Sequence, residues 1–163
     1  MNKSEQAFTV VVTPTTNRCP IGETIGNRNI AQGRIPVLSC EGACIRGEIA
    51  RLAANLVAKE EGFARGCHGE LLSVPDSAMA RWIRQAKQVV LIDGCFLRCH
   101  GRILENLLGK EQLRQFDALA VYKKYSDVFD LDAVPEEERQ QAARQVADLL
   151  IAVLKKEVSV PCG

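Results

Sequence analysis

One run of the sequence limits the possible folds more than any other: Gln88 to Ile92 reads QVVLI and is apolar along nearly its whole length. A strand with one face in water alternates apolar and polar side chains, whereas a continuous apolar run is typical of a parallel strand covered on both faces. Ile35 to Ser39 and Phe116 to Tyr122 have the same character. Because segments with helical periodicity alternate with these strands, the sequence predicts an α/β fold with a small, mostly parallel sheet.

Apolar residues recur at helical spacing in four segments. The predicted helices are a stretch around Ile49 to Val57 that stops at Gly62, Pro75 to about Lys87, Cys99 to Leu108, and Pro135 to Glu157. Phe8 to Thr13 is predicted to be a short strand, residues 14–34 an irregular segment, and Gly66 to Leu72 a loop followed by at most a short strand. The sequence contains no repeat, and we expect a single domain over residues 1–163.

The composition disfavours several classes of function. The chain has 21 Lys and Arg against 20 Asp and Glu, and only 5% of its residues are aromatic, so it lacks the basic and aromatic surface that binds nucleic acids. The N-terminus has no apolar core of a secretory signal, and no window approaches the roughly 18 apolar residues of a membrane helix. Neither common glycine-rich nucleotide loop is present. We therefore expect a cytoplasmic protein that binds neither nucleic acid nor a membrane.

Seven cysteines stand out in this nearly neutral chain. Disulfides are rare in a reducing cytoplasm, and an odd number of cysteines cannot pair completely within one chain. Two similar Cys-x3-Cys arrangements lie where a predicted strand turns into a helix, Cys40 with Cys44 and Cys95 with Cys99. Because the carboxyl ends of parallel strands share one edge of a sheet, we expect both pairs at that edge, where α/β proteins usually place their sites.

The chemistry of this edge favours thiolates. The free N–H groups and partial positive charge of a helix N-terminus lower the pKa of a thiol and stabilise a metal–thiolate cluster. Gly42 and Gly94 fit turns in which the backbone approaches a ligand closely. Four thiolates around one ion form a common closed zinc site. The candidate ligands from the two pairs are Cys40, Cys44, Cys95 and Cys99.

A fifth candidate ligand is Cys67, which lies in a glycine-flanked loop and is followed directly by His68. His100 follows Cys99, so both histidines of the chain lie beside candidate ligands. We interpret the histidines as neighbours of the site, although either could replace a cysteine because Cys3His zinc sites are common. Asp93 precedes the second pair, and we expect it to cap the following turn or to support a ligand.

Other functions stay open on the sequence alone. Either cysteine pair could act in thiol redox catalysis or redox sensing, since Cα atoms four residues apart on a helix are about 6 Å apart, within disulfide reach. An iron–sulfur cluster is a weaker alternative, because its usual short run of cysteines is absent. A metal ion with four thiolate ligands is a poor Lewis acid for the activation of water in hydrolysis, and an enzymatic activity is not predicted. Cys162 has no context that indicates a role, and Cys19 would join the site only if the irregular segment folded over it.

The expected function is therefore metal binding, with zinc as the first candidate, in a structural, carrier or sensing protein. Its expected partners are the metal ion and a protein that exchanges metal or electrons with it. The predicted C-terminal helix, residues 135–157, has an apolar stripe that fits either the core or a homodimer interface.

Two motifs resemble a known family. LIDGCFLRC, residues 91–99, resembles the signature of the DGC-domain family of small proteins regarded as zinc-binding, and SCEGA, residues 39–43, resembles the family's early Cys-x-Gly element. The resemblance covers about residues 35–130 and implies a Rossmann-like, three-layer α/β domain with a cysteine metal site, to which residues 1–34 look like an addition. Cys44 is not among the positions that the family shares uniformly. The matching ligand positions are Cys40, Cys67, Cys95 and Cys99.

Overall fold

Four parallel strands form the centre of the protein, of which the computed structural model describes residues 7–158. They lie in the order β2-β1-β3-β4, and each neighbouring pair is parallel. Leu38 lies beside Leu91 in the register of the two central strands. The prediction of a small parallel sheet is confirmed. The strands are β1 (Ile35–Ser39), β2 (Phe63–Arg65), β3 (Val89–Asp93) and β4 (Leu113–Asp117).

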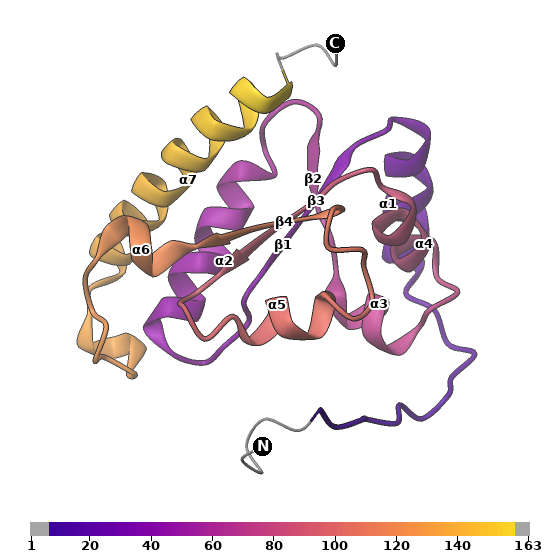
Figure 1. The fold of residues 1–163 in the computed structure, drawn as a ribbon, viewed down its shortest axis with the longest axis horizontal. Coiled ribbons are helices and arrows are strands. Elements are labelled where there is room, and N and C mark those ends of the chain that lie inside the picture. Colours follow the sequence, from indigo (N-terminus) through magenta and orange to yellow (C-terminus); the bar gives the residue numbers. More distant parts are fainter. Residues whose placement is uncertain (1–6, 159–163) are drawn as a thin grey trace.

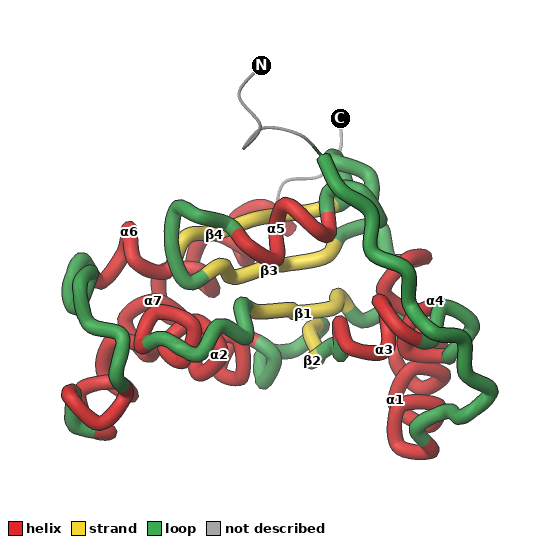
Figure 2. Tube along the Cα trace, turned by 90° about the horizontal axis from the view of Figure 1, so that it is seen from below, coloured by secondary structure: helices red, strands yellow, loops and turns green. Residues whose placement is uncertain are grey.

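Helices cover both faces of this sheet. The first group, α2, α6 and α7, packs with Val37, Val90 and Ile92 on one face. The second group, α3, α4 and α5, packs with Leu38 and Leu91 on the other, and α1 lies against α4. Figures 1 and 2 show α2 and α7 on one side of the strands and α1 and α4 on the other. The helices are α1 (Pro20–Ala31), α2 (Ile45–Val57), α3 (His68–Ser73), α4 (Ala78–Gln85), α5 (Cys99–Leu104), α6 (Ala118–Tyr122) and α7 (Glu136–Val158), with a 3-10 turn at Leu131–Ala133.

This three-layer arrangement confirms the Rossmann-like α/β architecture. All five residues of β3 are buried, because the strand is covered on both faces, which explains the continuous apolar run of its sequence. The predicted helices around Ile49–Val57 and Pro135–Glu157 are confirmed as α2 and α7.

The two central strands lead the chain toward opposite edges of the sheet. From β1 the chain crosses through α2 to β2 at one edge, whereas from β3 it crosses through α5 to β4 at the other edge. In open parallel sheets, ligands bind at the carboxyl ends of the strands where the crossovers diverge in this way. Cys40 follows the last residue of β1, and Cys95 lies just beyond the end of β3. Both cysteines therefore lie at the topological switch point.

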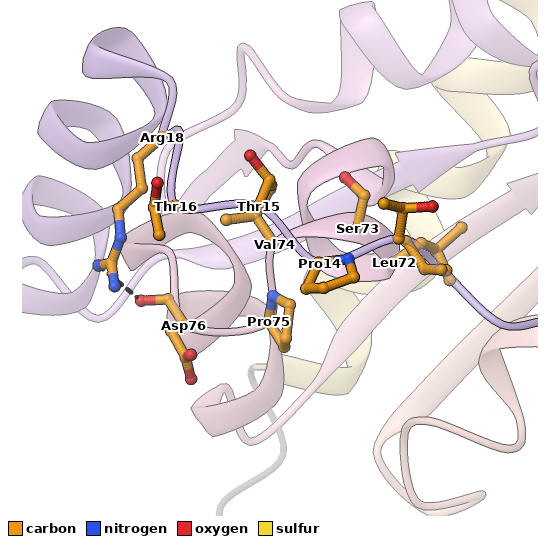
Figure 3. Close-up of a pocket in the computed structure, with 11 residues that line it drawn as sticks. Pro14, Thr15, Thr16, Arg18, Leu72, Ser73, Val74, Pro75 and Asp76 are labelled. Atoms are coloured by element: carbon orange, nitrogen blue, oxygen red, sulfur yellow. Dashed lines mark hydrogen bonds between the residues drawn. The ribbon is translucent and has the colours of Figure 1, made fainter.

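The predicted strand over Phe8–Thr13 is wrong. Residues 7–19 contain neither helix nor strand, and the side chains of Phe8 and Val11 are 87% and 89% exposed. Val and Thr favour extended backbone, but a strand needs a neighbour to accept its hydrogen bonds. This segment instead runs past the loop between α3 and α4, where Arg18 donates a hydrogen bond to the carbonyl of Asp76 at 3.0 Å (Figure 3).

The prediction of an irregular segment over residues 14–34 holds for residues 14–19 but is wrong over Pro20–Ala31, which form α1. Cys19 caps this helix, its Sγ accepting a hydrogen bond from the N–H of Gly22 at 3.4 Å. The buried face of α1 consists of Gly22, Gly26 and Asn29. Hydrophobic periodicity could not reveal such a helix, since α1 packs through backbone contact and has no large apolar stripe on its buried face.

Further boundaries differ from the predictions. The helix expected from Pro75 to about Lys87 is α4, which Ser77 caps and which ends at Gln85, so Pro75 lies before it. Gly66–Leu72 was expected to be a loop and at most a short strand, but the strand, β2, precedes it and α3 begins at His68. The expected strand Phe116–Tyr122 divides at Asp117, whose side chain accepts a hydrogen bond from the N–H of Ala120 and starts α6. The helix expected to reach Leu108 ends at Leu104. The side-chain cap at Asp117 and the short helices α3 and α6 thus occur where the apolar pattern predicts a loop and a longer strand.

No helix within residues 7–158 is long and apolar enough to cross a membrane.

Candidate functional site

Three helices begin at the carboxyl edge of the sheet, and the five candidate cysteines occupy their starts and the neighbouring turns. Cys40 and Cys95 are buried, Cys44 is half-buried, and Cys67 and Cys99 are exposed. Cys40 follows β1, Cys44 is the N-cap of α2, Cys67 is the N-cap of α3, Cys95 lies in the turn after β3, and Cys99 is the first residue of α5.

The turns after β1 and β3 meet through glycines. The N–H of Gly42 donates a hydrogen bond to the Sγ of Cys40 at 3.3 Å, and a Cβ on Gly47 would lie 2.2 Å from the carbonyl oxygen of Gly42. Gly94 packs with similar closeness on the start of α2. Gly47 and Gly94 therefore allow close approach of backbone segments, whereas a Cβ on Gly42 would meet only the Sγ of Cys40 at 3.3 Å.

Cys40 is at the centre of the site. Burial raises the pKa of its thiol, although the N–H groups of Gly42 and Gly94 act in the opposite direction. The negative charges of Asp93 and Cys99 raise this pKa further, which shows that both groups lie near Cys40. Cys40 is therefore held as a thiol in the absence of a cation that would stabilise its thiolate.

The two histidines lie together beside the cysteines. The ring centroids of His68 and His100 are 4.7 Å apart, with 55° between the ring planes. Burial, reinforced by the neighbouring His100, lowers the pKa of His68 to about 4. The Nδ1 of His100 is buried and has no hydrogen-bond partner among the described residues. We call Cys67, His68, Cys99 and His100 the histidine side of the site.

Asp93 lies close to His100 of the histidine side. Its side chain is 1% exposed, and its Oδ1 accepts a hydrogen bond from the N–H of Gly101 at 3.3 Å. Burial raises the pKa of Asp93, while the Gly101 N–H and the charges of His100 and Arg98 oppose the shift. The carboxyl thus holds the first turn of α5, which is one of the two roles expected for it. Its Oδ2 is buried without a hydrogen-bond partner in the described part of the chain.

Arg46, which we did not predict as a site residue, gives the opposite side a different character. Burial opposes the positive charge of Arg46, but the thiols of Cys44 and Cys95 and the hydroxyl of Tyr122 outweigh burial and raise the pKa of its guanidinium. We call Cys44, Arg46, Cys95 and Tyr122 the arginine side. The sequence did contain a signal for it, since a cation in the first turn of a helix is unfavourable unless a partner compensates it.

Arg46 also changes the chemistry of Cys44. Partial burial acts to raise the pKa of the Cys44 thiol, but the N–H groups of Gly47 and Arg46 and the Arg46 guanidinium together lower it. The thiol accepts no hydrogen bond of normal geometry as the cap of α2, so the backbone acts on it as nearby dipoles. Cys44 is thus a thiol with increased thiolate character.

Arg65, at the end of β2, braces the loop that carries Cys40. Its guanidinium donates hydrogen bonds to the carbonyl of Val37 at 2.8 Å, to Ser39 Oγ at 2.9 Å and to Glu41 Oε1 at 3.3 Å. The sequence offered no signal for this residue, because β2 has three residues and was not predicted. Tyr122 was missed for a similar reason, since it lies on a helix that was predicted to be a strand.

Polar atoms without partners concentrate at this edge. Of eight buried side-chain N and O atoms that lack a hydrogen-bond partner in the described structure, four belong to Arg46, Asp93, His100 and Tyr122. Buried polar groups are normally satisfied, so this cluster identifies the edge as the candidate binding site. Among residues 7–158, no three His, Cys, Asp or Glu side chains are arranged to hold a metal ion.

Cys19 does not contribute to this arrangement. Cys19 caps α1, and Cys162 lies outside the described residues. A hollow of about 410 Å³ between residues 12–18 and 72–76 (Figure 3) is lined by none of the five candidate cysteines.

The sequence was compared with known families, curated proteins and solved structures. The model of the DGC domain matches residues 36–148, which include all five candidate cysteines and extend into α7, beyond the boundary expected near residue 130. No curated protein and no solved structure matches. Since the matched region is more than half of the sequence, the chain belongs to the DGC-domain family.

Proposed function

We propose that this protein binds a metal ion, with zinc as the first candidate, through thiolates at the carboxyl edge of its sheet. The observation that carries the proposal is the meeting of three helix starts, those of α2, α3 and α5, at the topological switch point, each with a cysteine. Helix N-termini stabilise the net negative charge of a metal–thiolate cluster.

The donor atoms of the histidine side fit such an ion. Thiolate and imidazole are the ligands that zinc prefers in proteins, and a ligating histidine has to be neutral. The pKa of His68, at about 4, keeps its ring neutral at physiological pH. The buried Nδ1 of His100 and Oδ2 of Asp93 lack protein partners in the described structure, and they could ligate the ion or orient a ligand.

Four cysteines are the proposed ligands: Cys40, Cys67, Cys95 and Cys99. The electrostatic partner of Cys44 is Arg46, which would compete with a metal ion for its thiolate. Since the described side chains are not gathered around one point, binding requires thiols to turn. Cys67 and Cys99 are exposed and so are free to do this. A bound ion would join β1, α3 and α5 by a cross-link and add to the stability of the folded chain.

The exposure of Cys67 and Cys99 favours a carrier or sensing role over a purely structural one. A closed structural site buries its ligands, whereas exposed thiolates can be reached by a competing thiol of another protein. Cys44 is an additional thiol at the same edge of the sheet and could attack the ion during such an exchange. The expected partner is a protein that takes up or delivers the metal.

Elemental analysis of the full chain, purified under reducing conditions, tests the proposal. We expect about one equivalent of zinc in the wild type and a large decrease in Cys95→Ser and Cys99→Ser. Cys19→Ser is the matched control and should leave the metal content unchanged, because serine can replace the capping thiol of α1. Less than about 0.3 equivalents of any metal in the wild type would reject a resident metal site. Visible absorption after anaerobic purification would identify an iron–sulfur cluster instead.

Thiol redox chemistry is a second candidate, favoured by the lowered pKa of the Cys44 thiol. A thiolate near neutral pH is the attacking species in disulfide exchange. This function predicts that the metal-free protein contains a thiol that is alkylated rapidly below about pH 7.5. It also predicts a reversible disulfide within Cys40 and Cys44 or within Cys95 and Cys99. Mass mapping of the oxidised protein would detect either bond, and the absence of both would exclude this function.

A further inference from the structure

The arginine side of the site is not explained by a metal ion. A guanidinium repels a metal cation, and a neutral hydroxyl is a weak ligand for zinc. Arg46 and Tyr122 nevertheless lie beside two cysteines at the switch point. This combination of groups indicates a second ligand with a negative charge.

Tyr122 offers a hydrogen bond that nothing in the described protein accepts. Its side chain is 4% exposed, and its hydroxyl is buried without a hydrogen-bond partner among residues 7–158. The charged and thiol groups nearest to it include Arg46, Cys44 and Cys95. A phenol is neutral at physiological pH and can donate its proton to an anion.

Arg46 supplies a positive charge at the same place. The Nε of its guanidinium is buried and unpartnered in the described structure, although Arg46 itself is only half-buried. Guanidinium groups bind phosphate-type oxygens in pairs and retain their charge when partly desolvated.

The backbone adds further donors. Arg46 and Gly47 lie in the first turn of α2, a helix of 13 residues, and the first N–H groups of such a helix have no partner within it. Together with the helix dipole they favour an anion at this end. The nearest carboxyl to Tyr122, that of Asp117, accepts a hydrogen bond from the N–H of Ala120 in α6. The arginine side therefore brings together a guanidinium, a phenol hydroxyl and backbone N–H groups, and these N–H groups also act on the Cys44 thiol.

We propose that the arginine side binds a tetrahedral oxyanion of the phosphate and arsenate class. The Arg46 guanidinium, the Tyr122 hydroxyl and the first N–H groups of α2 would hold its oxygens, with the Cys44 thiol beside it. The groups that would hold the anion, Arg46, Tyr122 and the N–H groups of α2, are not among the proposed metal ligands, although Cys95 borders both sites. A phosphate monoester and a free oxyanion share this chemistry, since both present three equivalent oxygens.

Isothermal titration of the reduced full chain with inorganic phosphate, arsenate and phenyl phosphate tests the proposal. We expect saturable binding with a Kd of about 1 mM or below for at least one of the three. Phenyl phosphate distinguishes an ester from a free ion as the preferred ligand. Tyr122→Phe and Arg46→Leu should each weaken binding by about 10-fold or more, the effect of losing one hydrogen bond to a charged group.

Two matched control variants test whether the loss of anion binding is specific to Tyr122 and Arg46. Tyr125→Phe removes the hydroxyl of a half-buried tyrosine that donates a hydrogen bond to Glu138, and Arg51→Leu removes an arginine of α2 that pairs with Glu48. Both should bind the anion like the wild type. The metal content of every variant should equal that of the wild type, so a failure of the oxyanion site would leave the metal proposal standing, and the reverse also holds.

A second measurement needs no variant. A bound anion should slow the alkylation of Cys44 in the wild type and leave that of Cys19 unchanged, as peptide mass spectrometry would show. Absence of both saturable binding and protection of Cys44 would overturn the proposal. Equal affinity of wild type, Tyr122→Phe and Arg46→Leu would overturn it as well.

Discussion

A Cβ on Gly94 would lie 2.9 Å from the carbonyl carbon and oxygen of Arg46. The turn after β3 therefore rests directly on the first turn of α2, and this contact sets the positions of Cys95 and Cys44 relative to each other. Backbone at this distance cannot move aside as the end of a flexible side chain can. The contact thus couples the two Cys-x3-Cys segments mechanically, whether or not a ligand is bound.

Gly94→Ala should therefore separate the two turns. We expect a loss of about 1–3 kcal/mol in the free energy of unfolding, because the added methyl overfills a packed contact. Urea denaturation measures this loss. Gly109→Ala is the control, since a Cβ at Gly109 meets nothing within 4 Å, and it should change the stability by less than about 1 kcal/mol. Equal stabilities of the two variants would contradict the contact.

A second pair of glycines tests the helix that the sequence did not predict. A Cβ on Gly26 would lie 2.4 Å from backbone atoms of Ala78 and Met79, whereas a Cβ on Gly22 would meet only the flexible carboxylate of Glu70. Gly26→Ala should destabilise the protein by about 1–3 kcal/mol, despite the better helix propensity of alanine. Gly22→Ala in the same helix should be nearly neutral or stabilising. Thermal unfolding of both variants checks the docking of α1 on α4.

Arg46→Leu should shift the titration of Cys44. The Arg46 guanidinium and the first N–H groups of α2 outweigh the effect of burial and lower the pKa of this thiol. Removing the guanidinium should raise this pKa, so that alkylation of the Cys44 peptide increases at higher pH than in the wild type. Peptide mass spectrometry over a pH series measures the change. Arg51→Leu serves as control. An unchanged pH profile of Cys44 alkylation in Arg46→Leu would show that the Arg46 guanidinium does not act on the Cys44 thiol.

The metal-free protein should gain stability between about pH 4 and 6.5 through His68. The folded-state pKa is about 4 and the ordinary value is 6.5, so the unfolded chain binds the proton more tightly. The contribution is fully present above pH 6.5 and is lost as the pH falls toward 4. It amounts to at most about 3 kcal/mol. Urea unfolding of wild type and His68→Gln measures it, since the variant should lack this part of the pH dependence.

The four strands differ in how well the sequence predicts them. β1 and β3 were predicted because covered strands need continuous apolar residues, and both were found within one residue of the expected ends. β2 was missed because three residues carry too little pattern. The strand predicted over Phe116–Tyr122 is shifted relative to β4. The apolar pattern of this segment fits either a strand or a short helix, and only the cap at Asp117 decides between them.

The residues of the candidate site also differ in how well the sequence predicts them. The cysteines were found from local order, since a strand followed by Cys-x3-Cys and a helix places thiols at a known edge of a parallel sheet. The contact between the rings of His68 and His100 joins α3 to α5, and no local pattern encodes it. The position of Tyr122 beside Arg46 depends on α6, whose existence the apolar pattern concealed.

The sequence by itself determined the layered parallel architecture, the edge that carries the cysteines and the membership of a family. Those properties follow from periodicity and from residues that are near one another along the chain. Only the tertiary structure decided that the site has a histidine side and an arginine side. Such a division depends on where side chains from separate helices meet and on how burial and neighbouring charges change their protonation, and these are properties of the packed molecule.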